Sequence, residues 1–350
     1  MTGTPDARSA QTVSLIVPCR NEREHVDAFL DSVLAQRLPP GLALEIVLAD
    51  GASDDGTRAR LEARAAAEPR LRVVDNPERI TPTALNHAIA QARGEVVVRM
   101  DVHTVYAEDY VAACVQALQT TGASCVGGAW RPGPARSARQ AAIARAFESR
   151  FGSGGAASRR EGWSGPVDTV YLGAWWRDEL LRLGGFDPAL VRNQDDELNL
   201  RIHRSGGMVW QSAAIRSWYT PRASFGALAR QFYQYGYWKV PVIRKHRLPA
   251  APRHLVPFGF VATLLGGGLL APWWPPAGGL AASLGGLYAV LALGAAAADA
   301  RPWREPLAWL GIACAFACMH LSYGLGFGRA LLETVLLRRG PAASATRLTR

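Results

Sequence analysis

The sequence predicts an α/β fold, a mostly parallel sheet with helices on both faces, followed by C-terminal membrane helices. Two observations support this prediction. Short apolar runs alternate with helical segments through the first part of the 350-residue chain, as in sheets whose parallel strands are joined by helices. From residue 255 onward the chain is mostly Ala, Gly, Leu, Val and Trp, a composition typical of membrane segments.

Four strands and four helices are expected to alternate within the first 120 residues. Each strand is an apolar run, and each helix begins near a turn or capping residue. For the third helix, Thr81 is the expected N-cap and Pro82 lies in the first turn. The strands are expected at residues 13–17, 44–49, 71–74 and 95–100, and the helices at residues 22–36, 55–67, 81–92 and 109–119.

The middle of the chain is less regular. A helix is expected at residues 138–150, and the glycine-rich stretch 152–155 is either a plain linker or a flap that orders when substrate binds. A strand at 168–172 and helices at 175–183 and 194–205 follow. The segment 225–247 is aromatic and basic with helical spacing, which is typical of a helix lying on a membrane surface.

Three apolar segments follow, at residues 255–274, 277–298 and 307–327. Each is near the ~20 residues that span a bilayer. Three crossings would place residues 338–350, with their four Arg residues, on the far side of the membrane, whereas positive charge prefers the cytoplasmic side. Either one segment does not cross fully, or the chain crosses once more, and the number of spans stays open.

The formal net charge of +10 favours anionic partners. Basic residues cluster beside the apolar region, so a membrane surface and phosphate-bearing substrates are expected rather than nucleic acid. The first strand is not followed by GxGxxG, and the sequence holds no GxxxxGK[ST], HExxH or GxSxG motif. The polar first eleven residues carry no apolar signal-peptide core, so the first domain is expected to stay in the cytoplasm.

Polar side chains follow three of the predicted strands. They are Asn21 and Glu22, then Asp50, then Asp101 and His103. Ligands of an open parallel sheet bind beyond the carboxyl ends of its strands, which predicts a site there. Asp101 and His103 together offer oxygen and nitrogen ligands suited to Mn2+ or Mg2+, and such a cation can hold a diphosphate. Taken alone, the pair would be a capping Asp and a surface His.

Four segments in order resemble the motifs of family 2 glycosyltransferases with a GT-A fold. They are VSLIVPCRNE (13–22), DGASDDGT (50–57), DVH (101–103) and NQDDELNLR (193–201). Together with QFYQYGYWK (231–239) before an apolar region, they are most similar to ExoA-type succinoglycan and exopolysaccharide glycosyltransferases. The resemblance covers residues 13–247, and the membrane region is similar only in character.

The resemblance implies roles for the polar residues. The backbone after Pro18, with Asn21 and Glu22, would line the nucleotide pocket, and Asp50 would accept a hydrogen bond from the imide of uracil. Asp101 would bind the nucleotide's diphosphate through a cation held with His103. Because His103 replaces the family's second Asp, Mn2+ is expected to serve at least as well as Mg2+.

The resemblance also implies a catalytic base, Asp195, with Asp196 as its rival. Gln194 stands where the family has Glu, and the loss of that like charge is expected to lower the pKa of Asp195. A single base implies direct displacement with inversion. Residues expected to hold the acceptor or the diphosphate are Gln194, Gln231, Tyr235, Trp238 and Lys239, although those on 231–239 fit a lipid-interface helix equally well.

The implied organisation is a GT-A catalytic domain (1–222), an interfacial helix (223–254), about three membrane helices (255–337) and a basic tail (338–350). The implied activity is transfer of a hexose, glucose from UDP-glucose, to a polyprenyl-diphosphate-linked saccharide at the cytoplasmic face of the inner membrane, in exopolysaccharide synthesis. One alternative is a polyprenyl-phosphate sugar synthase, whose acceptor is the bare lipid phosphate. Another is a membrane sugar-nucleotide sensor without turnover.

Overall fold

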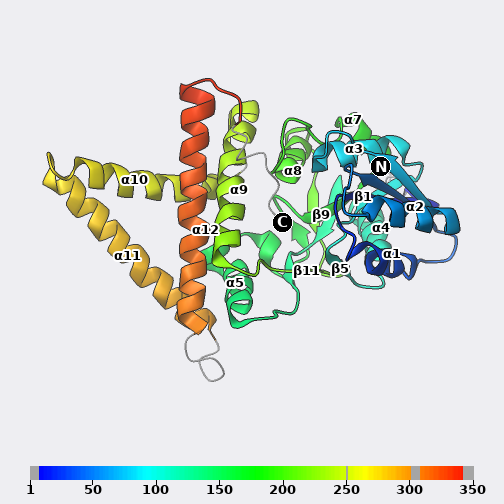
Figure 1. Ribbon diagram of the computed structural model, residues 1–350, viewed down its shortest axis with the longest axis horizontal. Coiled ribbons are helices and arrows are strands. Elements are labelled where there is room, and N and C mark those ends of the chain that lie inside the picture. The colour runs from blue at the N-terminus through cyan, green and yellow to red at the C-terminus, as the bar shows by residue number, and fades with distance from the viewer. Residues whose placement is uncertain (1–7, 250, 301–307, 342–350) are drawn as a thin grey trace, which may run out of the picture. The chain divides into compact units, whose positions relative to one another are not determined.

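The computed structural model describes residues 8–249, 251–300 and 308–341 (Figure 1). The chain forms two compact units. The first holds Met1–Gly133 and Arg160–Tyr219, and the second holds Pro134–Arg159 and Thr220–Arg350. The second unit therefore includes a segment inserted into the sequence of the first.

The first unit is built on an eight-stranded sheet in the order β3-β2-β1-β4-β9-β6-β10-β8. Its first four strands are all parallel, which confirms the strands predicted in the first hundred residues. They are β1 (Thr12–Cys19), β2 (Ala43–Asp50), β3 (Leu71–Asp75) and β4 (Val96–Arg99). Since β1 lies between β2 and β4, the carboxyl ends of three strands meet at one edge.

The other half of the sheet is mixed. Strand β9 (Tyr171–Trp176) runs antiparallel to both β4 and β6 (Cys125–Gly128). Strand β10 (Val209–Gln211) is parallel to β6, and β8 (Gly165–Pro166) closes that edge. A small second sheet holds β5 (Thr104–Tyr106), β11 (Ser217–Tyr219) and β7 (Arg131–Pro132).

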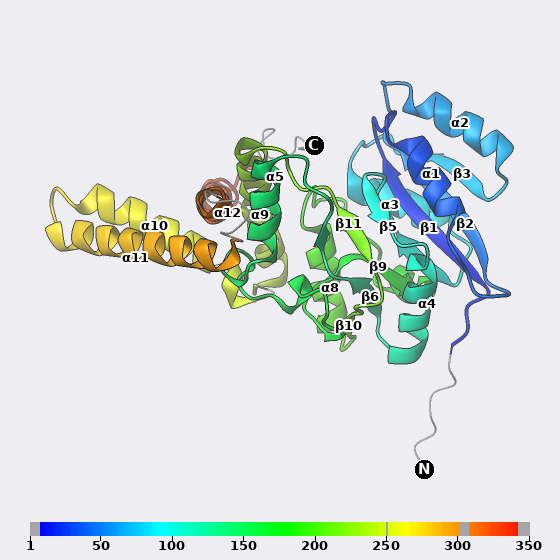
Figure 2. The ribbon, with the colours of Figure 1, turned by 90° about the horizontal axis from the view of Figure 1, so that it is seen from below.

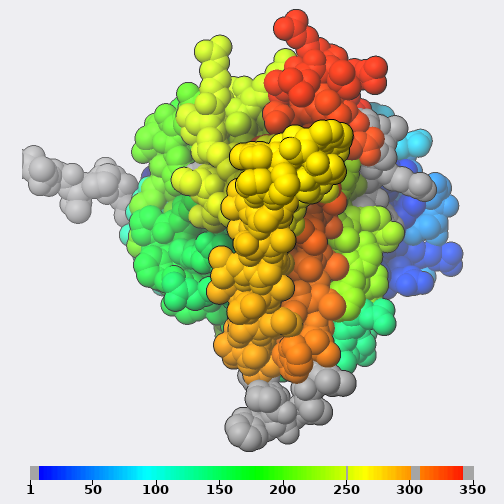
Figure 3. Space-filling view, turned by 90° about the vertical axis from the view of Figure 1, so that its left-hand side faces the viewer, coloured from blue at the N-terminus to red at the C-terminus, as the bar shows by residue number. Residues whose placement is uncertain are grey.

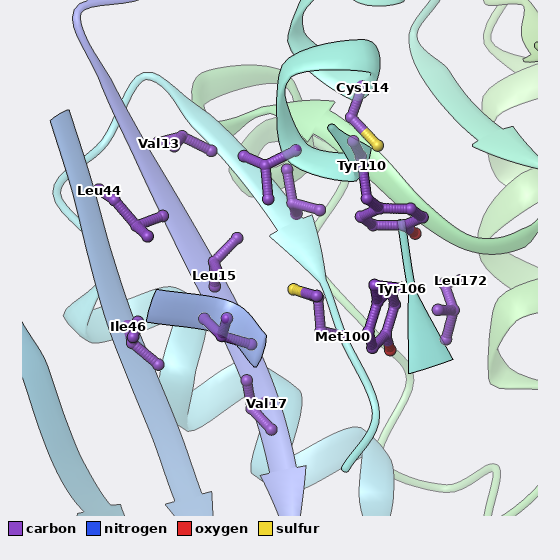
Figure 4. Close-up of a cluster of buried hydrophobic side chains, with 14 of the residues drawn as sticks. Val13, Leu15, Val17, Leu44, Ile46, Met100, Tyr106, Tyr110, Cys114 and Leu172 are labelled. Carbon is purple, nitrogen blue, oxygen red and sulfur yellow. The ribbon is translucent and has the colours of Figure 1, made fainter. Parts of the chain in front are cut away.

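Six helices belong to the first unit, within the residues described. They are α1 (Val26–Leu34), α2 (Thr57–Ala67), α3 (Thr81–Gln91), α4 (Tyr110–Thr121), α7 (Arg177–Arg182) and α8 (Gln194–Arg204). The core beneath them is made of alternating apolar residues of the central strands. Leu15 and Ile46 are fully buried there, and Met100 and Tyr106 continue the core toward α4 (Figure 4).

Four local predictions were wrong. The strand expected at 168–172 is displaced to Tyr171–Trp176, because Trp175 is buried and packs edge-on against Phe186 with ring centroids 5.8 Å apart. The helix expected from 175 therefore begins at Arg177. Thr81 is not the N-cap of α3: Ile80 holds that position in an extended conformation. Helix α1 begins at Val26, not at residue 22.

The second unit is helical in the residues described. Its elements are α5 (Ala138–Glu148), α6 (Arg150–Ser153), the short turns η1 (Ala157–Arg159) and η2 (Pro252–His254), α9 (Phe225–His246), α10 (Val256–Leu270), α11 (Pro275–Asp299), α12 (Ala308–Ala330) and a final π-helical turn, η3 (Leu331–Leu336). Part of the glycine-rich stretch at 152–155 is thus helical, since α6 ends at Ser153.

Helices α9 and α12 run side by side (Figures 1 and 2). Two glycines make the close approach possible. A Cβ on Gly236 would lie 2.0 Å from the carbonyl oxygen of Tyr323, and one on Gly326 would lie 2.0 Å from that of Tyr233. Three segments of the described chain are long and apolar enough to cross a membrane: Pro252–Leu270, Pro275–Asp299 and Ala308–Leu336.

Candidate active site

The carboxyl ends of β1, β2 and β4 carry the predicted nucleotide-binding residues. Cys19 is paired with Asp50 across β1 and β2, and the amide of Gly51 donates to the carbonyl oxygen of Cys19 at 2.8 Å. On the other side of β1, the amide of Met100 donates to the carbonyl oxygen of Ile16 at 3.1 Å. The sheet therefore brings the three loops to one edge, as the sequence predicted.

The loop after β1 is fastened to the loop after β2. Asn21 has a positive φ of 54°, and its amide donates to Ser53 Oγ at 2.8 Å. Its side chain exchanges two hydrogen bonds with Asp54, at 2.8 and 2.9 Å. The amide of Glu22 donates to Thr57 Oγ1 at 2.8 Å. The polar residues between 53 and 57 thus shape the turn.

Asp50 is buried at the end of β2, with 3% of the residue exposed. Ser53 Oγ donates to its Oδ1 at 2.5 Å, and the amide of Ser53 donates to its Oδ2 at 3.3 Å. Arg58 Nη1 lies 3.9 Å from Oδ2. These contacts fix the carboxylate in place and offset the cost of burying its charge.

Asp101 is positioned through its backbone by Tyr106. The Asp101 amide donates to the phenolic oxygen at 2.6 Å, and that hydroxyl donates to the Asp101 carbonyl at 3.1 Å. Tyr106 is itself buried between Phe29 and Tyr110. Burial holds the pKa of Tyr106 well above its ordinary value, so the hydroxyl stays neutral and can serve both bonds.

Arg99 connects Asp101 with Asp195, and sequence reasoning missed it. Its guanidinium donates to Asp101 through Nε, 3.1 Å from Oδ1, and through Nη2, 3.2 Å from Oδ2. Its Nη1 donates to Asp195 Oδ1. The Arg99 side chain is only 6% exposed. The one charged residue within the apolar run of β4 is therefore a buried cation shared by the predicted nucleotide-binding carboxylate and the predicted base.

The pKa of Asp195 is raised to about 6, contrary to the lowering expected from Gln194. Although a third of the side chain is exposed, loss of water around the carboxylate is the largest cause. Arg99 opposes the rise, and the nearby negative charges of Asp101 and Asp196 add to it. A carboxylate with a pKa near the working pH is well suited to accept a proton.

The helix that carries Asp195 is anchored by an ion pair between Glu197, in the same first turn, and Arg201, one turn later. Glu197 is fully buried, and Arg201 donates to both of its oxygens at 2.8–3.0 Å. Arg201 also donates to the carbonyl oxygens of Leu183 and Gly185. This fixes the first turn of α8, where Gln194 is buried and Asp195 and Asp196 are partly exposed.

The two residues predicted to hold a divalent cation, Asp101 and His103, follow the end of β4. Half of the His103 side chain is exposed, and its Nδ1 lies 3.8 Å from Glu22 Oε1. In the described part of the chain, no three His, Cys, Asp or Glu side chains form a metal-binding group by themselves. Asp101 and His103 would therefore share a cation with oxygens of a bound diphosphate, and each Asp101 oxygen keeps a second lone pair beside its bond to Arg99.

The remaining predicted residues lie on α9 in the second unit. Gln231 accepts from Arg222 Nε at 3.2 Å and donates to Tyr235 Oη at 2.8 Å. Trp238 and Lys239 are buried, with 1% and 3% exposed. Their contribution to acceptor or diphosphate binding stays a prediction, as does that of Gln194.

The sheet-edge site and the order of its motifs define a glycosyltransferase, and comparison with known proteins agrees. Residues 14–168 match the family model described as glycosyl transferase family 2. The chain is 32% identical over 333 residues to the succinoglycan biosynthesis protein ExoA of Rhizobium meliloti, covering 94% of this chain and 97% of that protein. The protein therefore belongs to glycosyl transferase family 2.

Two further relatives extend the comparison. The dolichyl N-acetyl-alpha-D-glucosaminyl phosphate 3-beta-D-2,3-diacetamido-2,3-dideoxy-beta-D-glucuronosyltransferase of Methanococcus voltae is 26% identical over 268 residues, covering 72% of this chain and 80% of that protein. The solved mannosyltransferase PcManGT from Pyrobaculum calidifontis, in complex with GDP-Man and Mn2+, has a TM-score of 0.55 at 23% identity, covering 91% of this chain and 88% of that one. This likeness confirms the GT-A fold.

Proposed function

We propose that the protein is an inverting, cation-dependent hexosyltransferase that moves glucose from UDP-glucose to a lipid-linked saccharide in exopolysaccharide synthesis. The observation that carries the proposal is the cluster in which Arg99 joins Asp101 to Asp195. In this cluster Asp101, proposed to bind the donor's diphosphate, and Asp195, the proposed base, both contact the buried guanidinium of Arg99. The extent of similarity to ExoA supports the polysaccharide context.

In the proposed reaction, Asp195 accepts the proton of an acceptor hydroxyl while that oxygen attacks the anomeric carbon of the donor. The new C–O bond forms opposite the diphosphate as the old one breaks, and UDP leaves with the bonding electron pair. The α-linked donor then yields a β-linked product. A pKa of about 6 leaves most of Asp195 ionised at neutral pH, ready to act as base.

Asp101 and His103 would hold the cation, with Mn2+ serving at least as well as Mg2+. When bound there, the cation would supply positive charge to the departing diphosphate. Asn21, Glu22 and the backbone after Pro18 would line the nucleotide pocket. Asp50 would accept a hydrogen bond from the imide N–H of uracil. This contact would select uracil over cytosine, because cytosine has an acceptor at the corresponding nitrogen.

The proposed acceptor is a polyprenyl-diphosphate saccharide, and the site would work at the cytoplasmic face of the inner membrane. The name of the Methanococcus relative, which describes transfer to a dolichyl-phosphate-linked sugar, supports a lipid-linked acceptor. The three apolar segments support membrane attachment. In this role Gln194, Gln231, Tyr235, Trp238 and Lys239 would contact the acceptor or the diphosphate.

A donor screen tests the proposal. Membranes holding the full chain are given UDP-glucose, UDP-galactose, GDP-mannose or a control without donor, together with lipid-linked saccharide, and nucleotide release is measured. We expect release of UDP from UDP-glucose that depends on the acceptor. Faster turnover of GDP-mannose would refute the proposed donor. Transfer of one sugar to bare polyprenyl phosphate would instead favour a polyprenyl-phosphate sugar synthase, and tight UDP binding without turnover of any donor would favour a sensor.

A further inference from the structure

The apolar helix α12 is covered along most of its length by helices that carry exposed charges. Near its start, a Cβ on Gly311 would lie 3.0 Å from Ala142 of α5, and Phe316 packs edge-on against Phe151 of α6 with ring centroids 5.1 Å apart. Exposed Arg139, Arg150 and Arg230 lie on these covering helices, α5, α6 and α9.

Further along α12, the covering helix is α9 instead of α5 and α6. The reciprocal glycine contacts at Gly236 and Gly326 are followed by Tyr237 Oη donating to Glu333 Oε2 at 2.7 Å. Arg244 Nη1 then donates to the carbonyl oxygen of Thr334 at 2.8 Å. From residue 311 to 334 this covered stretch is about 36 Å long, whereas the hydrocarbon core of a bilayer is about 30 Å thick.

If α12 crossed the bilayer, its covering helices would have to enter the hydrocarbon with it. Arg139, Arg150 and Arg230 would then lie among lipid chains, where each charged residue is costly. The buried fraction also distinguishes the α12 segment from the other two apolar segments. Within the most apolar stretch of each, 39% of the residues of the α12 segment are buried by protein, against 6% for the α10 segment and 17% for the α11 segment.

Helices α10 and α11, unlike α12, are largely uncovered by other helices. They form a hairpin that projects sideways from α12 (Figures 1 and 2), and α11 with its exposed side chains faces the viewer in Figure 3. Leu269 and Val290 are 70% and 68% exposed, and Trp273 and Trp274 stand at the turn between the helices, as interfacial aromatics do. Helix α11, at 25 residues, is about 37 Å long, and the apolar segment Pro252–Leu270, which ends with α10, has 19 residues, about 28 Å. Both lengths are close to or above the thickness of the hydrocarbon core.

We propose that only the α10–α11 hairpin inserts into the bilayer and that α12 lies along the membrane surface beside α9. Two crossings return the chain to its starting side. The exposed basic residues at the ends of α9 and η3 then meet the anionic headgroups of the cytoplasmic leaflet, which removes the conflict between three crossings and a basic tail. These residues are Arg244, Lys245, Arg247, Arg338 and Arg339.

Membrane depth along α12 tests the proposal. In the full chain, with Cys314 and Cys318 changed to Ala, nitroxide labels are placed singly at three exposed positions, Leu310→Cys, Leu325→Cys and Leu336→Cys, and the protein is reconstituted in vesicles containing anionic lipid. Collision with oxygen and with a water-soluble nickel complex gives the depth of each label. We expect three similar, shallow depths, with Val290→Cys on α11 clearly deeper.

A label at Leu325 that is deepest, with Leu310 and Leu336 near opposite surfaces, would overturn the proposal. A second measurement examines the chain after η3. Gly340→Cys in the same background should resist a membrane-impermeant maleimide in intact cells and react in inverted membrane vesicles. Reaction in intact cells and protection in inverted vesicles would place this residue on the far side and also refute the two-crossing arrangement.

Discussion

Removing the guanidinium of Arg99, which contacts both Asp101 and Asp195, should destabilise the fold and shift the pH dependence of catalysis. In Arg99→Gln, the carboxylates of Asp101 and Asp195 lose three charge-assisted hydrogen bonds from a side chain that is 6% exposed. Breaking a buried pair from one side costs about 3–5 kcal/mol. Since Asp101 and Asp195 keep 17% and 33% exposure, we expect the lower end, about 3 kcal/mol in the free energy of unfolding.

The catalytic effect follows from the sign of the Arg99 contribution. Arg99 lowers the pKa of Asp195, so its loss raises that pKa above the wild-type value of about 6. The base acts when deprotonated, and kcat/KM therefore falls about tenfold per pH unit below this pKa. In wild type the acid limb should lie near pH 6, and in Arg99→Gln it should move toward higher pH.

The assay is kcat/KM from pH 5 to 9 for wild type, Arg99→Gln and Arg99→Lys. Arg99→Lys keeps the charge but not the forked geometry, so its acid limb should stay closer to wild type than that of Arg99→Gln. Thermal denaturation shows whether Arg99→Gln is folded. If the folded variant has the same acid limb of kcat/KM as wild type, the proposed coupling of Arg99 to the base is refuted.

Three further predictions concern the proposed base, the cation and the contact between α9 and α12. Asp195→Asn should lower kcat by about 10²–10⁴-fold, and Asp196→Asn much less, with equal losses contradicting the assignment of the base. Chelator treatment should abolish UDP release, and Mn2+ should restore it. His103→Ala should raise the Mn2+ concentration needed for half-maximal UDP binding, measured by calorimetry. Full activity after chelation would show that catalysis does not need a cation. Gly236→Ala should destabilise the second unit by about 1–3 kcal/mol, because the new Cβ would meet the Tyr323 carbonyl. The control Gly226→Ala lies in the same helix with open space around it and should be neutral or slightly stabilising. Thermal denaturation in detergent measures both effects.

The parallel half of the sheet could be predicted because each strand is an apolar run that ends at a polar loop. Residues 13–17 and 44–49 have this pattern, and their order along the chain places Asn21, Glu22 and Asp50 at one edge. Strand β9 was misplaced because Gly173 interrupts its apolar run, and a charged helix-forming stretch follows Trp175 and Trp176. Their β conformation depends on pairing with β4, which local sequence does not reveal.

The electrostatics of the site could not be predicted from neighbours in the sequence. Arg99 and Asp195 are 96 residues apart, and only the fold brings them together. An Arg within an apolar strand was the one available signal. The pKa of Asp195 was predicted with the wrong sign because the substitution at Gln194 was considered while burial and the charge of Asp101 were not.

The anomeric configuration of the first product tests the central claim most directly. Full-length protein in native lipid is supplied with UDP-α-glucose and a lipid-linked acceptor, and the new linkage is assigned by proton NMR before any anomerisation. We expect a β-linkage from wild type and no detectable product in the same time from Asp195→Asn. An α-linked product would contradict single-step displacement with Asp195 as the base.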